Sequence, residues 1–162
     1  MKNRAYITTY HKIIEAVAII ISVAAVIVGI VFALTAEGEV PIHFGLNGEP
    51  TAYGSAWSGF FLPIVLLVSN LGISGLLRFV AVETWNMPCK VPESYAPFAY
   101  RDCITMMVLM QLLFGIMSIL GTIFMYTARN LMGPSIMICC GILMIVTGFY
   151  FVKIIVMSKR YA

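Results

Sequence analysis

Charged side chains are scarce in this sequence. They make up 10% of its 162 residues, whereas 61% of the residues are hydrophobic. A soluble domain has roughly 25% charged residues, so there are too few here to cover a surface that faces water. The net charge of +3 is small and spread along the chain, and we therefore expect no nucleic-acid partner. Lipid is the alternative solvent, which indicates an all-α integral membrane protein.

Cysteine is also scarce, and its positions match no metal-binding or disulfide pattern. The four cysteines are Cys89, Cys103, Cys139 and Cys140, without the Cys-x-x-Cys or Cys/His spacing of zinc sites. On a helix, the adjacent pair would project about 100° apart and would not bridge. We expect no cofactor, no metal ion and no disulfide framework.

Four uncharged apolar runs are present instead, each close to the roughly 20 residues that a helix needs to cross a bilayer. They occupy more than half of the chain and leave no room for a separate soluble domain. We expect a single membrane domain over 1–162, a bundle of four transmembrane helices at about 13–34, 57–77, 103–126 and 134–156. Loops over 35–56 and 78–102 connect them. A signal-peptide core has roughly 7–15 residues, fewer than the first run, so the first helix is expected to be retained.

Basic residues predict the orientation of this bundle. With the amino terminus inside, the cytoplasmic segments hold nine of the ten lysines and arginines, and only Arg129 lies outside. The positive-inside rule favours this arrangement. Both termini are then cytoplasmic, and the 35–56 loop, which contains three glutamates and no basic residue, is extracytoplasmic. We expect a multi-pass protein of the bacterial cytoplasmic membrane, with the lipid bilayer as its first partner.

Polar side chains inside the expected spans lie at one depth. Asn70 is eight residues from Arg78, and Gln111 is eight residues from Cys103, so both lie about 12 Å from the cytoplasmic boundary. Ser22 and Thr147 fall near the same level. An unsatisfied amide in hydrocarbon costs several kcal/mol, so we expect Asn70 and Gln111 to meet across the second and third helices. These interhelical polar contacts are interpreted as structural, because a hydrated pathway or binding pocket normally includes an ionisable residue at mid-depth.

The 35–56 loop carries the densest turn signals of the chain. Asn47-Gly48 favours a tight turn because both residues accept positive φ, and Pro41 requires an extended entry. We expect an ordered loop that folds over the outer ends of the helices. His43 could join the loop glutamates in a metal site or, more simply, donate a hydrogen bond from its imidazole to a turn carbonyl. The candidate binding residues of this loop are Pro41, His43, Phe44, Asn47, Gly48, Glu49, Tyr53 and Gly54.

The same loop resembles a known family. The pattern Pro41-x-His43-Phe44, Asn47-x-x-Pro50, Tyr53-Gly54-Ser55 and Leu62-Pro63 is similar to a bacterial membrane domain of unknown function. In longer relatives this domain forms the amino-terminal half of immunity proteins against the sporulation-delaying toxin. Segments between Asn86 and Arg101 resemble the stand-alone members with four spans, so the resemblance covers about 20–105. Thr51 and Ala56 depart from it, since acidic and basic residues are common there.

The resemblance implies a membrane protein with an extracytoplasmic recognition loop, of the immunity type. Its partner would be a peptide toxin or another membrane protein, and its oligomeric state is left open. An accessory subunit that packs against other membrane proteins is the alternative, and a small transporter is a weaker one. An enzyme needs a nucleophile–base pair or a metal constellation, which the sequence does not offer, so a non-enzymatic role is expected.

Overall fold

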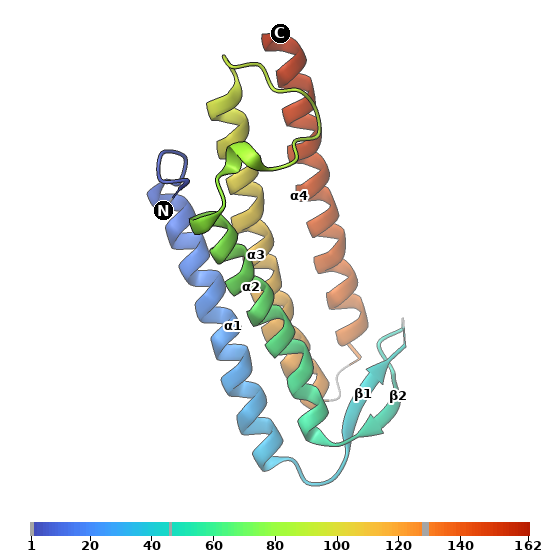
Figure 1. Ribbon diagram of the computed structural model, residues 1–162. Coiled ribbons are helices and arrows are strands. Elements are labelled where there is room, and N and C mark those ends of the chain that lie inside the picture. Colours follow the sequence, from blue (N-terminus) through green and yellow to red (C-terminus); the bar gives the residue numbers. More distant parts are fainter. Residues whose placement is uncertain (1, 46, 128–129) are drawn as a thin grey trace.

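A computed structural model describes residues 2–45, 47–127 and 130–162, most of them helical. Four long helices lie lengthwise beside one another, with a small β-hairpin at one end and both termini toward the other (Figure 1). In chain order the elements are α1 (Thr9–Thr35), β1 (Val40–Phe44), β2 (Pro50–Gly54), the 3-10 helix η1 (Ala56–Phe60), α2 (Phe61–Phe79), the 3-10 helix η2 (Val82–Thr84), α3 (Ala96–Tyr126) and α4 (Met132–Tyr161).

Four of these helices are long and apolar enough to cross a membrane, the same number as the spans that the sequence predicts. They extend beyond the apolar runs, most clearly at α3, which begins at Ala96 rather than near 103. Pro97 suits this first turn, because the amide that proline lacks would have no helical partner there. At the start of α1, Thr8 and His11 form a capping box. Polar helix ends of this kind are expected where a span leaves the hydrocarbon.

The 35–56 segment contains two short strands that an all-α description leaves out. β1 and β2 pair antiparallel, with Val40 opposite Gly54 and Phe44 opposite Pro50. The register is irregular on both sides of His43. Pro41 accounts for part of this irregularity, because it has no amide hydrogen to donate to a neighbouring strand.

α3 is the central helix, since it packs against α1, α2 and α4. The small residues of α1 that recur at spacings of four, three and four form a buried face, as their spacing predicts; they are Ala18, Ser22, Ala25 and Gly29. A Cβ on Gly115 of α3 would lie 2.9 Å from the Ala18 carbonyl oxygen, so glycine allows these two backbones to approach closely. α4 is less covered than the other helices. In its apolar 18-residue stretch 6% is buried, against 22–33% in the corresponding stretches of the other three.

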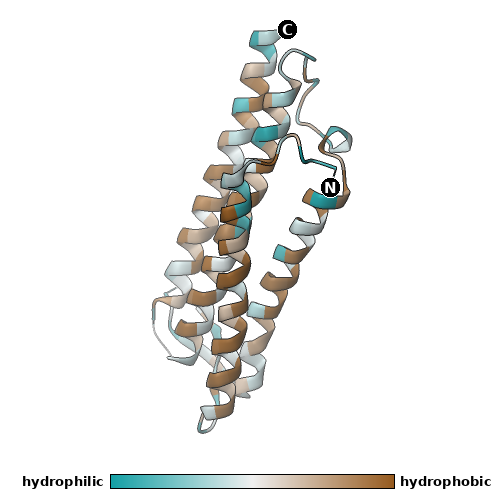
Figure 2. Cartoon of the chain, turned by 90° about the vertical axis from the view of Figure 1, so that its left-hand side faces the viewer, coloured by the Kyte–Doolittle hydropathy of each residue, from teal (hydrophilic) through white to brown (hydrophobic). Residues whose placement is uncertain are grey.

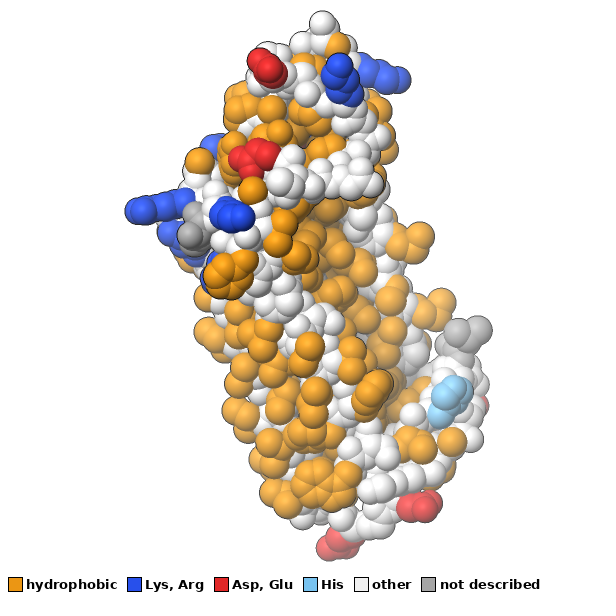
Figure 3. Space-filling view, in the orientation of Figure 1, with side chains coloured by type: hydrophobic (Ala, Val, Ile, Leu, Met, Phe, Trp, Pro, Cys, Tyr) orange, Lys and Arg blue, Asp and Glu red, His pale blue; other side chains and the backbone are white. Residues whose placement is uncertain are grey.

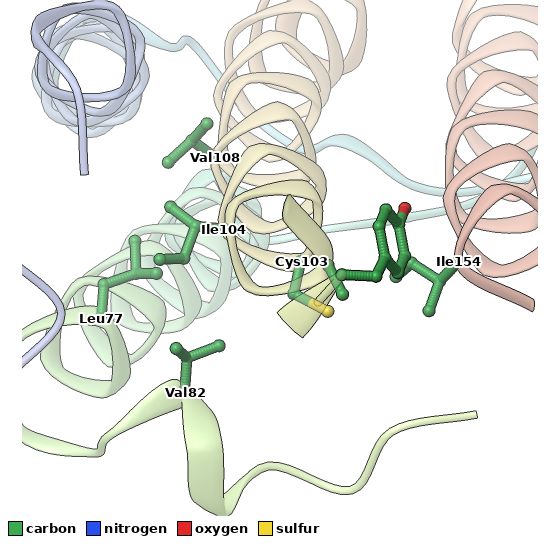
Figure 4. Close-up of a cluster of buried hydrophobic side chains, with 8 residues drawn as sticks. Leu77, Val82, Cys103, Ile104, Val108 and Ile154 are labelled. Carbon is green, nitrogen blue, oxygen red and sulfur yellow. The ribbon is translucent and has the colours of Figure 1, made fainter. Parts of the chain in front are cut away.

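A hydrophobic cluster closes the bundle at the end that carries the termini. Leu77, Val82, Ile104 and Ile154 are almost fully buried in it, and they come from α2, η2, α3 and α4 (Figure 4). Asn3 ties the amino-terminal segment to this end: its amide donates to the carbonyls of Leu77 (2.9 Å) and Val80 (2.8 Å), and its oxygen accepts from the Val82 amide (2.8 Å).

Charge is distributed unevenly along the bundle. Hydrophobic residues follow the helices over their length, and hydrophilic residues gather toward the end with the termini (Figure 2). Lysine and arginine side chains lie toward that end, whereas acidic side chains lie at both ends, some of them near the hairpin (Figure 3). Arg129, the one basic residue expected on the hairpin side, lies outside the described residues.

Candidate functional site

The base of the hairpin is fixed to the ends of α1 and α3. Val40 and Ala56 pack with Ala33 in a small buried cluster, and Tyr126 lies against it. The Tyr126 hydroxyl donates to the Ala56 carbonyl (2.6 Å), and its ring stacks on Phe32 with centroids 5.1 Å apart. These contacts set the direction in which the hairpin leaves the bundle.

The tip of the hairpin packs on the start of α4, backbone against backbone. Gly48 has φ +82°, and a Cβ there would lie 2.0 Å from the Asn130 carbonyl oxygen. On the α4 side, a Cβ on Gly133 would lie 3.0 Å from the Gly45 carbonyl oxygen. Asn47 shapes the turn: its side chain accepts from the Glu49 amide (3.1 Å) and donates to the Glu49 carboxylate (2.7 Å). Glycine on both surfaces is therefore what permits this close approach.

An apolar groove of about 270 Å³ lies between the hairpin and α4. Its hairpin wall includes Ile42, His43 and Phe44, and its helix wall includes Ile136 and Met137. This volume is slightly below the usual range for small-molecule sites, about 300–1,000 Å³, and the lining is largely aliphatic. Such a groove can accept one or two apolar side chains, and the imidazole at its edge adds a hydrogen-bonding group.

The candidate loop residues differ in how far they are exposed. Pro41 and Gly48 are buried, so they support the hairpin. His43, Asn47, Glu49 and Tyr53 are exposed and available for contact, with Phe44 and Gly54 in between. His43 Nδ1 is hydrogen-bonded to the Thr51 hydroxyl on β2, and not to the turn carbonyl expected from the sequence. Among the described residues, no three metal-ligating side chains gather in one place.

Buried polar side chains at one depth, which we call the polar layer, connect α1, α2 and α3. Asn70 Nδ2 donates to Ser22 Oγ (2.8 Å) and to the Gln111 backbone carbonyl (3.1 Å). In return, Gln111 Nε2 donates to the Asn70 backbone carbonyl (2.9 Å) and to Ser74 Oγ (2.9 Å). Ser22, Asn70 and Gln111 are all fully buried. Each side-chain amide therefore bonds to the backbone of the other residue's helix. The side-chain oxygens, Asn70 Oδ1 and Gln111 Oε1, accept no hydrogen bond from the described residues.

Thr147 does not take part in this layer. Its hydroxyl donates to the Leu143 carbonyl of its own helix (2.8 Å), so the expected interhelical contact at this position is wrong. The depth of Thr147 follows from counting residues along α4, but the direction of its side chain depends on how α4 rotates against α3. Because threonine can bond to the carbonyl four residues earlier, it needs no partner on another helix.

Two ion pairs lie between helices toward the end with the termini. Glu15 of α1 pairs with Arg78 of α2, and Arg78 also donates to the Ser74 carbonyl (3.0 Å). Lys153 of α4 pairs with Asp102 of α3 at 2.7 Å, and Asp102 also accepts from the Tyr95 hydroxyl (3.2 Å). Both pairs connect neighbouring helices.

Sequence reasoning missed the α4 half of the groove. Met132, Gly133, Ile136 and Met137 recur at spacings of one, three and one, which places them on one helical face. That pattern was readable, but it is equally typical of a face that contacts lipid. Only the position of the hairpin tip over Gly133 identifies it as one wall of a groove.

Comparison with known proteins finds a similarity for part of the chain. The model of a domain of unknown function, DUF1648, matches residues 20–67, which include most of α1, the hairpin and the first turns of α2. No curated protein and no solved structure matches the chain. The matched segment contains the hairpin wall of the groove and ends before the α4 wall. A domain of unknown function followed by two further helices able to span a membrane fits a multi-pass membrane protein.

Proposed function

We propose that this chain is a non-enzymatic recognition protein of the immunity type, which binds an apolar peptide, such as a membrane-active toxin, in the groove between the hairpin and α4. The observation that carries the proposal is the close packing of Gly48 and Gly133, which holds two apolar walls at a fixed separation. A preformed groove does not have to be ordered when its ligand binds, and this lowers the entropic cost of association.

The surface around the groove supports peptide recognition. Tyr53 on β2 and Trp57 on η1 are each more than half exposed, and aromatic residues of this kind supply much of the binding energy of protein interfaces. His43 and Glu49 add groups that can hydrogen-bond a peptide backbone. A bound apolar peptide would gain about 25 cal/mol for each Å² of apolar surface removed from water.

The proposed setting is the bacterial cytoplasmic membrane, with both termini inside and the hairpin outside. Its support is the distribution of charge, because the described lysines and arginines lie toward the end opposite the hairpin (Figure 3). A toxin arriving from outside the cell would then meet the groove first.

Photocrosslinking tests this proposal. A photoreactive phenylalanine analogue at Met137, which lines the groove, should capture a short apolar peptide in native membranes. The same analogue at Ile138, adjacent in sequence and 63% exposed but outside the groove, is the matched control. The captured peptide, made synthetically, should compete with crosslinking and should arrest cells that lack the chain but not cells that contain it. Equal capture at both positions, or capture only of integral membrane proteins, would contradict the proposal and favour an accessory subunit.

A further inference from the structure

A second hollow lies on α4, far from the hairpin and unconnected with the proposed recognition function. It measures about 530 Å³ and is lined by one face of the helix from Ile145 to Met157. Gly148 lies in this hollow with open space over it, since a Cβ there would meet no atom within 4 Å. Twelve residues of helix cover about 18 Å, close to the half-thickness of a bilayer core, about 15 Å. The hollow is therefore about as long as one leaflet of the bilayer core is deep.

This apolar hollow continues into a smaller and more polar one. The second measures about 170 Å³ and shares Lys153 and Met157 with the first. Arg101, Asp102 and Tyr161 also line it. An apolar hollow beside a small charged hollow matches an amphiphile, whose apolar chain would lie in the first and whose charged headgroup would lie in the second.

The charge of the smaller hollow is positive. Its one acidic group, Asp102, is already paired with Lys153 at 2.7 Å and hydrogen-bonded by Tyr95. Arg101 is exposed and pairs with no acidic side chain among residues 2–45, 47–127 and 130–162. Lys159 and Arg160 follow on α4 and are exposed as well. Basic pockets between helices at a membrane surface bind anionic headgroups.

We propose that this continuous surface, Ile145 to Met157 with Arg101, is a binding site for one anionic phospholipid. An acyl chain lies along α4 over Gly148, and the phosphate lies against Arg101, the cation of the smaller hollow that Asp102 does not neutralise. A second copy of the chain fits less well. A two-fold contact on the same face would bring the two Lys153 side chains toward each other, and like charges at close range in a low dielectric repel strongly.

Native mass spectrometry of the detergent-purified protein tests the site, with phosphatidylglycerol and phosphatidylcholine of equal chain length as probes. The wild type should retain phosphatidylglycerol at least threefold more than phosphatidylcholine. Gly148→Leu should lose most of both lipids because leucine fills the hollow. Gly72→Leu is the matched control: this glycine lies exposed on α2, and its Cβ also meets nothing within 4 Å. Leucine favours helix over glycine, so both variants should fold, which circular dichroism checks.

Arg101→Gln separates the headgroup from the chain, and it should bind the two lipids equally. Excess glycerol phosphate should not displace phosphatidylglycerol, because the acyl chain contributes most of the contact. Unchanged phosphatidylglycerol binding by Gly148→Leu, or no headgroup preference in the wild type, would overturn the proposal. A wild-type dimer that Gly148→Leu converts to a monomer would do the same, by assigning this face to a second copy.

Discussion

Replacing Gly48 with alanine tests the packing that creates the recognition groove. The new Cβ would lie 2.0 Å from the Asn130 carbonyl oxygen, whereas ordinary contacts begin at 3.4 Å, so the hairpin tip must move by about 1.4 Å. A non-glycine residue in the left-handed region costs about 1–2 kcal/mol. Overpacking adds about 1–3 kcal/mol. We therefore expect Gly48→Ala to lower the free energy of unfolding by about 2–5 kcal/mol, measured by titration with SDS in mixed micelles.

Gly38→Ala is the control for the backbone contribution. Gly38 has φ +90°, close to that of Gly48, but a Cβ there meets no atom within 4 Å. It should cost about 1–2 kcal/mol and leave the hairpin in place. Limited proteolysis should then cut the hairpin faster in Gly48→Ala than in Gly38→Ala. If the two variants lose the same stability and resist protease equally, the tip does not pack on α4 and the groove has only one wall.

Three further predictions test the contacts inside the bundle. Asn70→Leu should cost about 0.6–2 kcal/mol of unfolding free energy, the range for interhelical hydrogen bonds in membranes, whereas Thr147→Val should cost less than about 0.5 kcal/mol because Thr147 bonds only to its own helix. Glu15→Gln removes the charge paired with Arg78 and should cost about 1.5–3 kcal/mol, with a coupling to Arg78→Gln in a double-mutant cycle. Asn3→Ala loses three hydrogen bonds and should expose the amino-terminal segment to protease, at a cost of about 1.5–4.5 kcal/mol.

Each of these has a distinct contrary outcome. An equal effect of Asn70→Leu and Thr147→Val would mean that the polar layer contributes no interhelical stability. Additive effects of the Glu15 and Arg78 substitutions would mean that the ion pair is not formed in the membrane. An Asn3→Ala protein with wild-type protease resistance would mean that the amino-terminal segment is held by other contacts.

The sequence predicts the parts of this fold that depend on composition and local chemistry. Uncharged runs identify four helices, because length and hydropathy are sufficient for a span. Asn47-Gly48 identifies the hairpin turn, because the backbone there needs positive φ. The strands on either side were missed, since Pro41 interrupts the alternation that normally marks a strand. Helix ends were missed by several residues; α3 begins at Ala96, but Arg101 and Asp102 interrupt its apolar pattern before the long uncharged run starts at Cys103.

The candidate site is less predictable than the fold because it depends on how elements pack. The meeting of Asn70 and Gln111 follows from their common depth and from the cost of burying an unpaired amide. Thr147 has the same depth but faces elsewhere, since rotation about the α4 axis is set by packing against α3. Met137 and its neighbours become a groove wall only once the hairpin tip lies over Gly133. No local pattern in the sequence encodes that contact.

The most direct test of the account is the side of the membrane on which the hairpin lies. Single cysteines at Glu49 in the hairpin and Glu93 in the loop before α3, both exposed, can be introduced after the four native cysteines are replaced. In intact cells a membrane-impermeant maleimide should label Glu49→Cys at once and Glu93→Cys only after permeabilisation. Labelling of Glu93→Cys but not of Glu49→Cys would place the groove in the cytosol, and labelling of both would contradict a bundle that crosses the membrane.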